Sequence, residues 1–141
     1  MLFPKKVKYR KWQTSRENPK SIGVATRGLT VAFGSHGVKA TTAGRLTANQ
    51  IEASRRVISR TLGKTGKVWI RVFPDMPYTK KPAEVKMGKG KGDIEGYCVP
   101  VKPGRMIFEV DGVTDEIALE ALRKAGKKLP IKTRIVSRIG N

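Results

Sequence analysis

Hydrophobic residues recur along the chain with two spacings, one typical of strands and one typical of helices. Alternation of apolar and polar residues predicts a half-buried strand over 28–34, with Leu29, Val31 and Phe33 on one face. A turn is predicted at 35–37, after which 38–40 can pair back with that strand. Further strands are predicted over 67–73, 97–101, 106–110 and 131–139. Residues 102–105, Lys-Pro-Gly-Arg, favour a turn between the two middle ones.

A helix is predicted over 47–62, because apolar residues there follow helical spacing. Thr47 and Gln50 form a capping-box pattern, in which each side chain satisfies a backbone amide at the start of the helix. Gly63 is expected to end the helix. The apolar stripe comprises Ile51, Ile58 and Leu62.

A second helix is predicted from Thr114, as its cap, to about Lys128. Acidic residues in its first turn and basic residues at its end suit the helix dipole. Small residues in its apolar stripe imply close packing on a sheet. The stripe comprises Ala118, Ala121, Leu122, Ala125 and Leu129.

The order of elements predicts an α+β fold in which two helices pack on a mixed, largely antiparallel sheet. The length of 141 residues favours one domain, 1–141. Two segments lie outside the periodic pattern. Residues 1–27 are expected to form a basic arm, and residues 75–96 a long loop rich in Lys and Gly.

Net charge narrows the class of partner. Thirty Lys and Arg face eleven Asp and Glu, giving +19, and a polyanion is the usual counterpart of such an excess. No run of about eighteen apolar residues exists, so a membrane span is not expected. The N-terminus has no apolar stretch of the signal-peptide kind, and the chain is therefore expected to stay in the cytosol. Nucleic acid remains the favoured partner.

The charge is unevenly distributed. Residues 1–74 contain sixteen basic and two acidic residues, whereas residues 75–141 contain fourteen basic and nine acidic ones. This asymmetry predicts one face toward RNA and another toward water or a protein partner. Five of the acids fall in one stretch: Glu109, Asp111, Asp115, Glu116 and Glu120.

Basic residues in the arm, on the first helix and near it are candidate contacts with RNA. In the arm, Tyr9 and Trp12 stand among the cations and are available to stack on bases or sugars. On the first helix, residues spaced four apart share one positive face, and phosphate contact is favoured over simple solvation. The predicted set is Lys5, Lys6, Lys8, Arg10, Lys11, Arg45, Arg55, Arg56, Arg60, Lys64 and Arg71.

The Lys–Gly segment has a chemistry of its own. Gly brings the backbone close to a phosphate ribbon, and alternating Lys supply mobile charges with long reach. A thin, positive probe into RNA is favoured over a flexible linker, which is more often Ser-rich or mixed in charge. The segment comprises Lys86, Met87, Gly88, Lys89, Gly90, Lys91 and Gly92.

Enzymatic alternatives lack their required residues. Gly63-Lys64-Thr65 imitates the end of a P-loop, but Ile58 stands where the first Gly is needed and the element order is reversed. The Lys–Gly segment imitates a dinucleotide loop, but Glu95 replaces its last Gly. Cys98 and His36 are single, so no zinc site is expected; a Cys–His pair is formally open, with Cys98 favoured as a buried small residue. No catalytic residue, metal or cofactor is predicted.

Several ordered blocks resemble bacterial large-subunit ribosomal protein sixteen, a universal family shared with archaeal and eukaryotic L-ten-e. They are residues 1–6 and 9–11, Gly44-Arg45-Leu46-Thr47-Ala48-Asn49-Gln50-Ile51-Glu52-Ala53, Lys64-Thr65-Gly66-Lys67-Val68-Trp69-Ile70-Arg71-Val72-Phe73-Pro74, Val85-Lys86-Met87-Gly88-Lys89-Gly90-Lys91-Gly92 and Leu129-Pro130-Ile131-Lys132-Thr133. The resemblance implies an α/β-hammerhead fold. It implies that the protein is a structural constituent of the large ribosomal subunit and binds ribosomal RNA (rRNA) and neighbouring ribosomal proteins. It also implies a cytoplasmic location, no membrane partner and no homo-oligomer.

The resemblance also implies contact with A-site tRNA, and with P-site tRNA as a further partner, near the peptidyl-transferase centre. The Lys–Gly segment is the part expected on the tRNA side. Two departures stand out: Lys86 replaces the Arg common in the family, which binds phosphate differently, and residues 13–27 fit the pattern poorly. The alternative from another class is a free basic nucleic-acid-binding protein or RNA chaperone.

Overall fold

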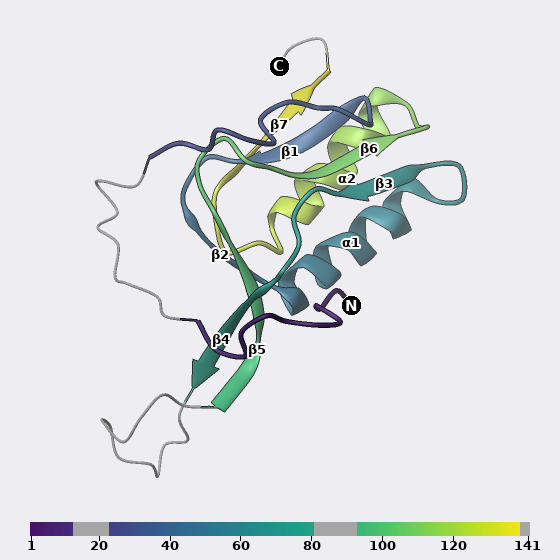
Figure 1. The fold of residues 1–141 in the computed structure, drawn as a ribbon. Helices are drawn as coiled ribbons and strands as arrows, with labels where there is room; N and C mark the ends of the chain where they lie inside the picture. Colours follow the sequence, from purple (N-terminus) through teal and green to yellow (C-terminus); the bar gives the residue numbers. More distant parts are fainter. Residues whose placement is uncertain (13–22, 81–92, 139–141) are drawn as a thin grey trace.

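A computed structural model describes residues 1–12, 23–80 and 93–138 of the chain. Within these residues the fold is α+β, with two helices and two small antiparallel sheets (Figure 1). No helix of the described part is both long and apolar enough to cross a membrane. The elements are β1 (His36–Ala40), β2 (Gly44–Thr47), α1 (Ala48–Leu62), β3 (Lys67–Ile70), β4 (Met76–Lys80), β5 (Asp93–Val101), β6 (Met106–Asp111), α2 (Asp115–Gly126) and β7 (Thr133–Ser137).

The strands form two sheets, not the single mixed sheet that the sequence predicted. The larger has the order β3-β6-β1-β7 and the smaller the order β2-β5-β4, and every pairing among the described residues is antiparallel. The turn at 102–105 is present, with Gly104 at a φ of 98°. It connects β5 of the smaller sheet to β6 of the larger one, so strands adjacent in sequence pair with different neighbours (Figure 1).

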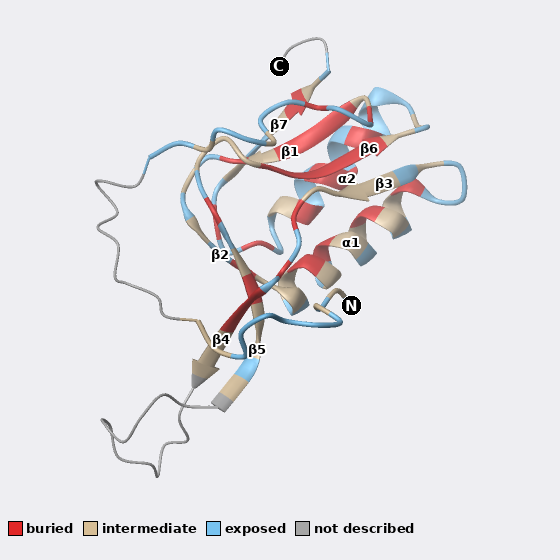
Figure 2. Ribbon diagram, in the orientation of Figure 1, coloured by how far each residue is buried: buried red, intermediate tan, exposed pale blue. Residues whose placement is uncertain are grey.

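The main core lies between the two helices and one face of the larger sheet. Every residue of both predicted apolar stripes is buried there, and Figure 2 shows the buried positions gathered where helices and strands face each other. α1 and α2 also contact each other directly: the buried Ser54 hydroxyl donates to the Ala125 carbonyl at 3.3 Å. Small residues on α2 permit this close approach.

The ends of α1 match the sequence prediction. The Gln50 amide donates to the Thr47 hydroxyl at 3.3 Å, and the Thr47 amide donates to the Gln50 side chain at 2.9 Å. Gly63 ends the helix at a φ of 73°, a conformation that favours glycine. The predicted capping box is therefore confirmed.

α2 matches in position but differs at its start. Thr114 occupies the N-cap position without a side-chain cap hydrogen bond, so its predicted capping role is wrong in that respect. Asp115 and Glu116 lie in the first turn as predicted. The helix ends at Gly126, two residues before the expected end.

The predicted strand over 28–34 is wrong. This segment is irregular and lies over the face of the larger sheet that points away from the helices, where Val31 packs with Met106 and Val136. The first strand is instead His36–Ala40, which begins inside the turn expected at 35–37. Residues 38–40 do lie in a strand, but they pair with β6 and β7 and not with 28–34. The amides of 32–34 donate to a carboxylate, and they are therefore not available for a strand ladder.

Other strands also differ from the prediction, and β5 begins at Asp93 instead of at 97. β4 falls inside the predicted loop 75–96; it carries Pro77 and lies at the edge of the smaller sheet, where proline is tolerated. β2 was not predicted at all. β3 ends at Ile70 instead of Phe73, and β7 spans Thr133–Ser137 within the predicted 131–139.

Candidate nucleic-acid interface

The N-terminal arm begins beside the start of α1 (Figure 1). The amino group of Met1 lies 3.9 Å from a Glu52 oxygen, and Leu2 packs against the main core. The cationic side chains that follow are exposed, apart from the half-buried Lys11. The arm is thus anchored at one end, with its charge toward solvent. The exposed cations are Lys5, Lys6, Lys8 and Arg10.

Most cationic side chains on the basic face of α1 are exposed. Arg56 is 68% exposed in its side chain, Arg60 is exposed, and Lys64 follows the helix end in an exposed position. Glu52 partly neutralises this face, since it pairs with Arg55 at 2.5 Å and with Arg56 at 3.4 Å. The hydrogen bond from Arg55, with the nearby positive charges, lowers the pKa of Glu52 to about 2.

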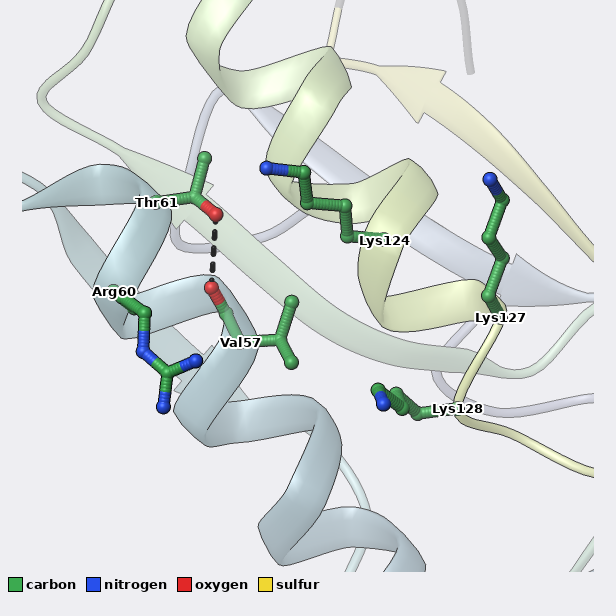
Figure 3. Close-up of a pocket in the computed structure, with 6 residues that line it drawn as sticks. All are labelled: Val57, Arg60, Thr61, Lys124, Lys127 and Lys128. Carbon is green, nitrogen blue, oxygen red and sulfur yellow. Dashed lines mark hydrogen bonds between the residues drawn. The ribbon is translucent and has the colours of Figure 1, made fainter.

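A groove between α1 and α2 brings four cationic side chains together. Figure 3 shows Arg60 on the α1 side of the groove and Lys124 across from it on α2, with Lys127 and Lys128 just after α2 ends. The groove has a volume of about 350 Å³. Its α1 side also carries Val57 and Thr61, whose hydroxyl donates to the Val57 carbonyl at 3.0 Å.

The lysines of this groove are candidate functional residues that sequence reasoning missed. Lys127 and Lys128 were interpreted only as partners of the α2 dipole. Four basic residues among the six of 123–128 were the available signal. Their proximity to Arg60 depends on the side-by-side packing of the helices, which neither helix sequence specifies alone. One of them, Lys124, is paired with Glu120 at 3.1 Å.

Arg71, a predicted rRNA contact, is already paired. Its guanidinium donates to Glu109, whose side chain is fully buried, and only 20% of the Arg71 side chain is exposed. The other Glu109 oxygen accepts the amides of Ala32, Phe33 and Gly34 at 2.9, 2.8 and 3.0 Å. Contact between Arg71 and RNA stays a prediction, while its geometry assigns it a structural role.

The remaining predicted positions lie around the smaller sheet. Arg45 is exposed on β2. The Lys–Gly segment 86–92 lies outside the described residues, but the strands on either side of it are described. Lys80 and Asp93 pair in register, so the segment connects neighbouring strands at the end of the sheet that points away from the larger sheet (Figure 1).

The Cys–His alternative does not come together. Cys98 is buried in β5 of the smaller sheet, and burial raises the pKa of its thiol. His36 lies in β1 of the larger sheet, within 3.0 Å of the Ser35 hydroxyl and 3.6 Å of Asp115. Across the described ranges, no cluster of three His, Cys, Asp or Glu side chains could hold a metal ion.

Comparison with known proteins decides the family. The model of the family described as ribosomal protein L16p/L10e matches residues 4–136. The chain belongs to this family. The L16p/L10e assignment makes it a ribosomal protein, with a structural and not an enzymatic role.

Relatives match over almost the whole chain. A protein of Halorhodospira halophila named large ribosomal subunit protein uL16 is 54% identical over 138 residues, covering 98% of both chains. The protein of that name in Afipia carboxidovorans is 56% identical over 139 residues, covering 99% of this chain and 98% of its own. The one in Thermosipho melanesiensis is 56% identical over 138 residues, covering 98% and 94%.

Proposed function

We propose that the chain is a constituent of the large ribosomal subunit that binds rRNA through two basic surfaces. The first is the part of the arm that the structure describes, residues 1–12. The second, here called the helix groove, comprises Val57, Arg60, Thr61, Lys124, Lys127 and Lys128. The observation that carries the proposal is that four cationic residues, from α1, from α2 and from just after α2, line one groove in a member of a ribosomal protein family.

The chemistry of the helix groove suits an RNA backbone. Cationic side chains on both walls can contact successive phosphates, and each contact releases condensed counterions. Val57 and the methyl group of Thr61 form a small apolar surface that a ribose can contact. Within the described part of the chain, Glu120 is the acidic side chain paired with a cation of the groove, and it is itself exposed beside Lys124.

The tRNA side of the proposal concerns the Lys–Gly segment 86–92. In the sequence it lies between β4 and β5, two strands that do not line the helix groove. We assign A-site tRNA, and P-site tRNA as a further contact, to this segment, and rRNA to the arm and groove. Family resemblance supports this division.

The protein is further proposed to lie on cytoplasmic ribosomes beside other ribosomal proteins. It is proposed to form no homo-oligomer. The two antiparallel sheets are proposed to be of the α/β-hammerhead type. These statements follow from the family resemblance, supported by near-complete coverage of relatives named as large-subunit proteins.

Sedimentation of cell extract tests the proposed function. The protein should co-migrate with large subunits at moderate salt, because binding to folded rRNA combines shape with charge. A free nucleic-acid chaperone would stay near the top of the gradient. Recovery of most of the protein in that free pool would show that the ribosomal assignment is wrong for this chain.

A double variant tests the tRNA side. Lys89→Ala with Lys91→Ala should slow tRNA accommodation while leaving incorporation into subunits close to that of the unaltered protein, because the arm and groove are unchanged. The matched control is Lys102→Ala with Lys132→Ala, two exposed lysines outside the segment. Normal peptide synthesis by fully assembled subunits carrying the first pair would contradict the assignment.

A further inference from the structure

Phe33 is an apolar side chain in an unexpected place. The alternating pattern predicted it on the inner face of a strand, yet 56% of its surface is exposed. It belongs to the irregular segment that crosses the outer face of the larger sheet, much of which is exposed (Figure 2). A single exposed Phe is not unusual, so its significance depends on how firmly it is held.

Hydrogen bonds to residues of β6 fix the backbone around Phe33. Three consecutive amides, those of residues 32–34, donate to one oxygen of the buried Glu109. The next amide, of Ser35, donates to the Val110 carbonyl at 2.9 Å. At Gly34 the segment passes so close to β6 that a Cβ there would collide with the Val110 carbonyl oxygen. This segment therefore has little freedom to withdraw the ring.

Two side chains of the β3 region also lie against the ring. Trp69 stacks against it, with ring centroids 6.2 Å apart and planes inclined by 22°. The Arg71 guanidinium carbon lies 5.0 Å from the Phe33 centroid, and the same guanidinium is held by Glu109. Trp69 and Arg71 are two residues apart and so lie on one face. Beside these two side chains, more than half of the Phe33 surface, 56%, stays exposed.

The surroundings favour a flat ligand that belongs to a polyanion. Arg138, which is exposed, donates to the Ala32 carbonyl at 2.7 Å. The Arg71 guanidinium lies beside the Phe33 ring. The carboxylate in this network, Glu109, is fully buried with both oxygens occupied. Ala32 and Gly34, the immediate neighbours, are too small to form the broad apolar patch typical of a protein contact.

We infer that the outer face of Phe33 is a preformed stacking site for an unpaired RNA base. Aromatic side chains bind unstacked bases in this way, and adjacent cations hold the phosphates. Because the ring is already ordered, binding costs little side-chain freedom. The inference rests on the proposed function, since it requires RNA at this surface, but it assigns a site that neither the basic arm nor the helix groove includes.

Ultraviolet cross-linking of large subunits that contain the protein tests the contact directly. Irradiation should join a nucleotide to Phe33, detected by mass spectrometry as a nucleotide adduct on the peptide that contains it. Adducts elsewhere on the same chain, with none at Phe33, would overturn the inference. A cross-link from Phe33 to a neighbouring protein would overturn it as well.

Substitutions measure what the ring contributes. Subunits lacking the protein are titrated with each variant, and half-saturating concentrations are compared. Phe33→Leu keeps an apolar side chain but removes the aromatic face, and should weaken incorporation about fivefold, at the lower end of the range for one stacked base. Phe33→Tyr should bind like the unaltered protein. Phe73→Leu, at another Phe that is 45% exposed, is the matched control and should have no effect.

The outcomes separate this inference from the proposed function. If the unaltered protein fails to enter subunits, the proposed function fails. If it enters and Phe33→Leu enters equally well, the stacking site alone fails. Thermal unfolding guards against a folding artefact: a weakened Phe33→Leu supports the inference when its melting temperature matches that of Phe33→Tyr. A melting temperature that falls in step with affinity in both variants would overturn it.

Discussion

The environment of Glu109 in the fold differs from the one that its neighbours in the sequence predict. It stands first in the acidic stretch 109–120, which was expected to face water or a partner, yet it is fully buried. Burial alone would raise its pKa, but the amides of Gly34 and Phe33, with the Arg71 guanidinium, lower the pKa overall. The carboxylate joins the irregular segment to the sheet, and so it is part of the structure and not of the acidic surface.

Glu109→Gln should destabilise the protein by about 3–5 kcal/mol, the usual cost of removing one partner of a buried ion pair. The amide cannot neutralise Arg71, and its NH₂ group faces donors. Urea unfolding measures the change. The matched control is Glu120→Gln on the exposed Glu120–Lys124 pair, which should cost less than about 1 kcal/mol. Similar losses of stability in the two variants would contradict the structural role of Glu109.

Acid should weaken the fold through carboxylates whose pKa is lowered. Glu52 has a pKa of about 2 against a usual 4.5, and that of Glu109 is also lowered. A carboxylate whose pKa is lower in the folded protein stabilises the fold at pH values above its unfolded-state pKa. This stabilisation is lost as the pH falls through the folded-state pKa. The free energy of unfolding should therefore decline between about pH 4.5 and 2. Glu52→Gln should reduce that decline by up to about 1 kcal/mol; parallel profiles for both proteins would contradict it.

At the scale of elements, helices were predicted better than strands. The spacing, cap and terminal glycine of α1 are all local in sequence, and all three are confirmed. Strand prediction failed over 28–34 because a strand needs a hydrogen-bonding partner, and here a distant carboxylate takes the amides. β4 was missed because Pro77 breaks the pattern, although an edge strand accommodates it.

The two helices offer a matched test of capping. Thr47→Ala removes a capping-box hydrogen bond from α1 and should lower the free energy of unfolding by about 1 kcal/mol. Thr114→Ala changes the same residue type at the N-cap of α2, where the side chain makes no cap hydrogen bond, and should change stability by less than about 0.5 kcal/mol. Chemical denaturation of both variants distinguishes them. Equal destabilisation would mean that Thr114 also caps its helix.

At the scale of the whole molecule, the helix groove should contribute to the salt dependence of RNA binding. Replacing Lys127 and Lys128 with Ala should lower the slope of log affinity against log salt concentration by about one for each phosphate that the variant no longer binds. Titration of an rRNA fragment at several salt concentrations measures this. Lys102→Ala with Lys132→Ala is the control pair of equal charge. An unchanged slope for the groove variant would remove the groove from the RNA surface.

The sequence by itself determined the charge, the α+β class, both helices with their buried stripes, and the family resemblance. These depend on local spacing or on ordered blocks of residues, which need no knowledge of distant contacts. Its predicted RNA-binding residues of the arm and α1 are exposed for the most part, but their contacts with RNA stay predictions. The Lys–Gly segment lies outside the described residues.

Only the tertiary structure decided which strands share a sheet, which charges remain available and which aromatic is exposed. Arg71 and Glu109 are 38 residues apart in sequence, and Arg60 and Lys124 line one groove only because two helices pack side by side. Phe33 is turned outward because residues 32–34 bind a carboxylate more than seventy residues away. Such pairings are set by long-range packing, so a pattern along the chain could assign each residue a type of surface but not its partner.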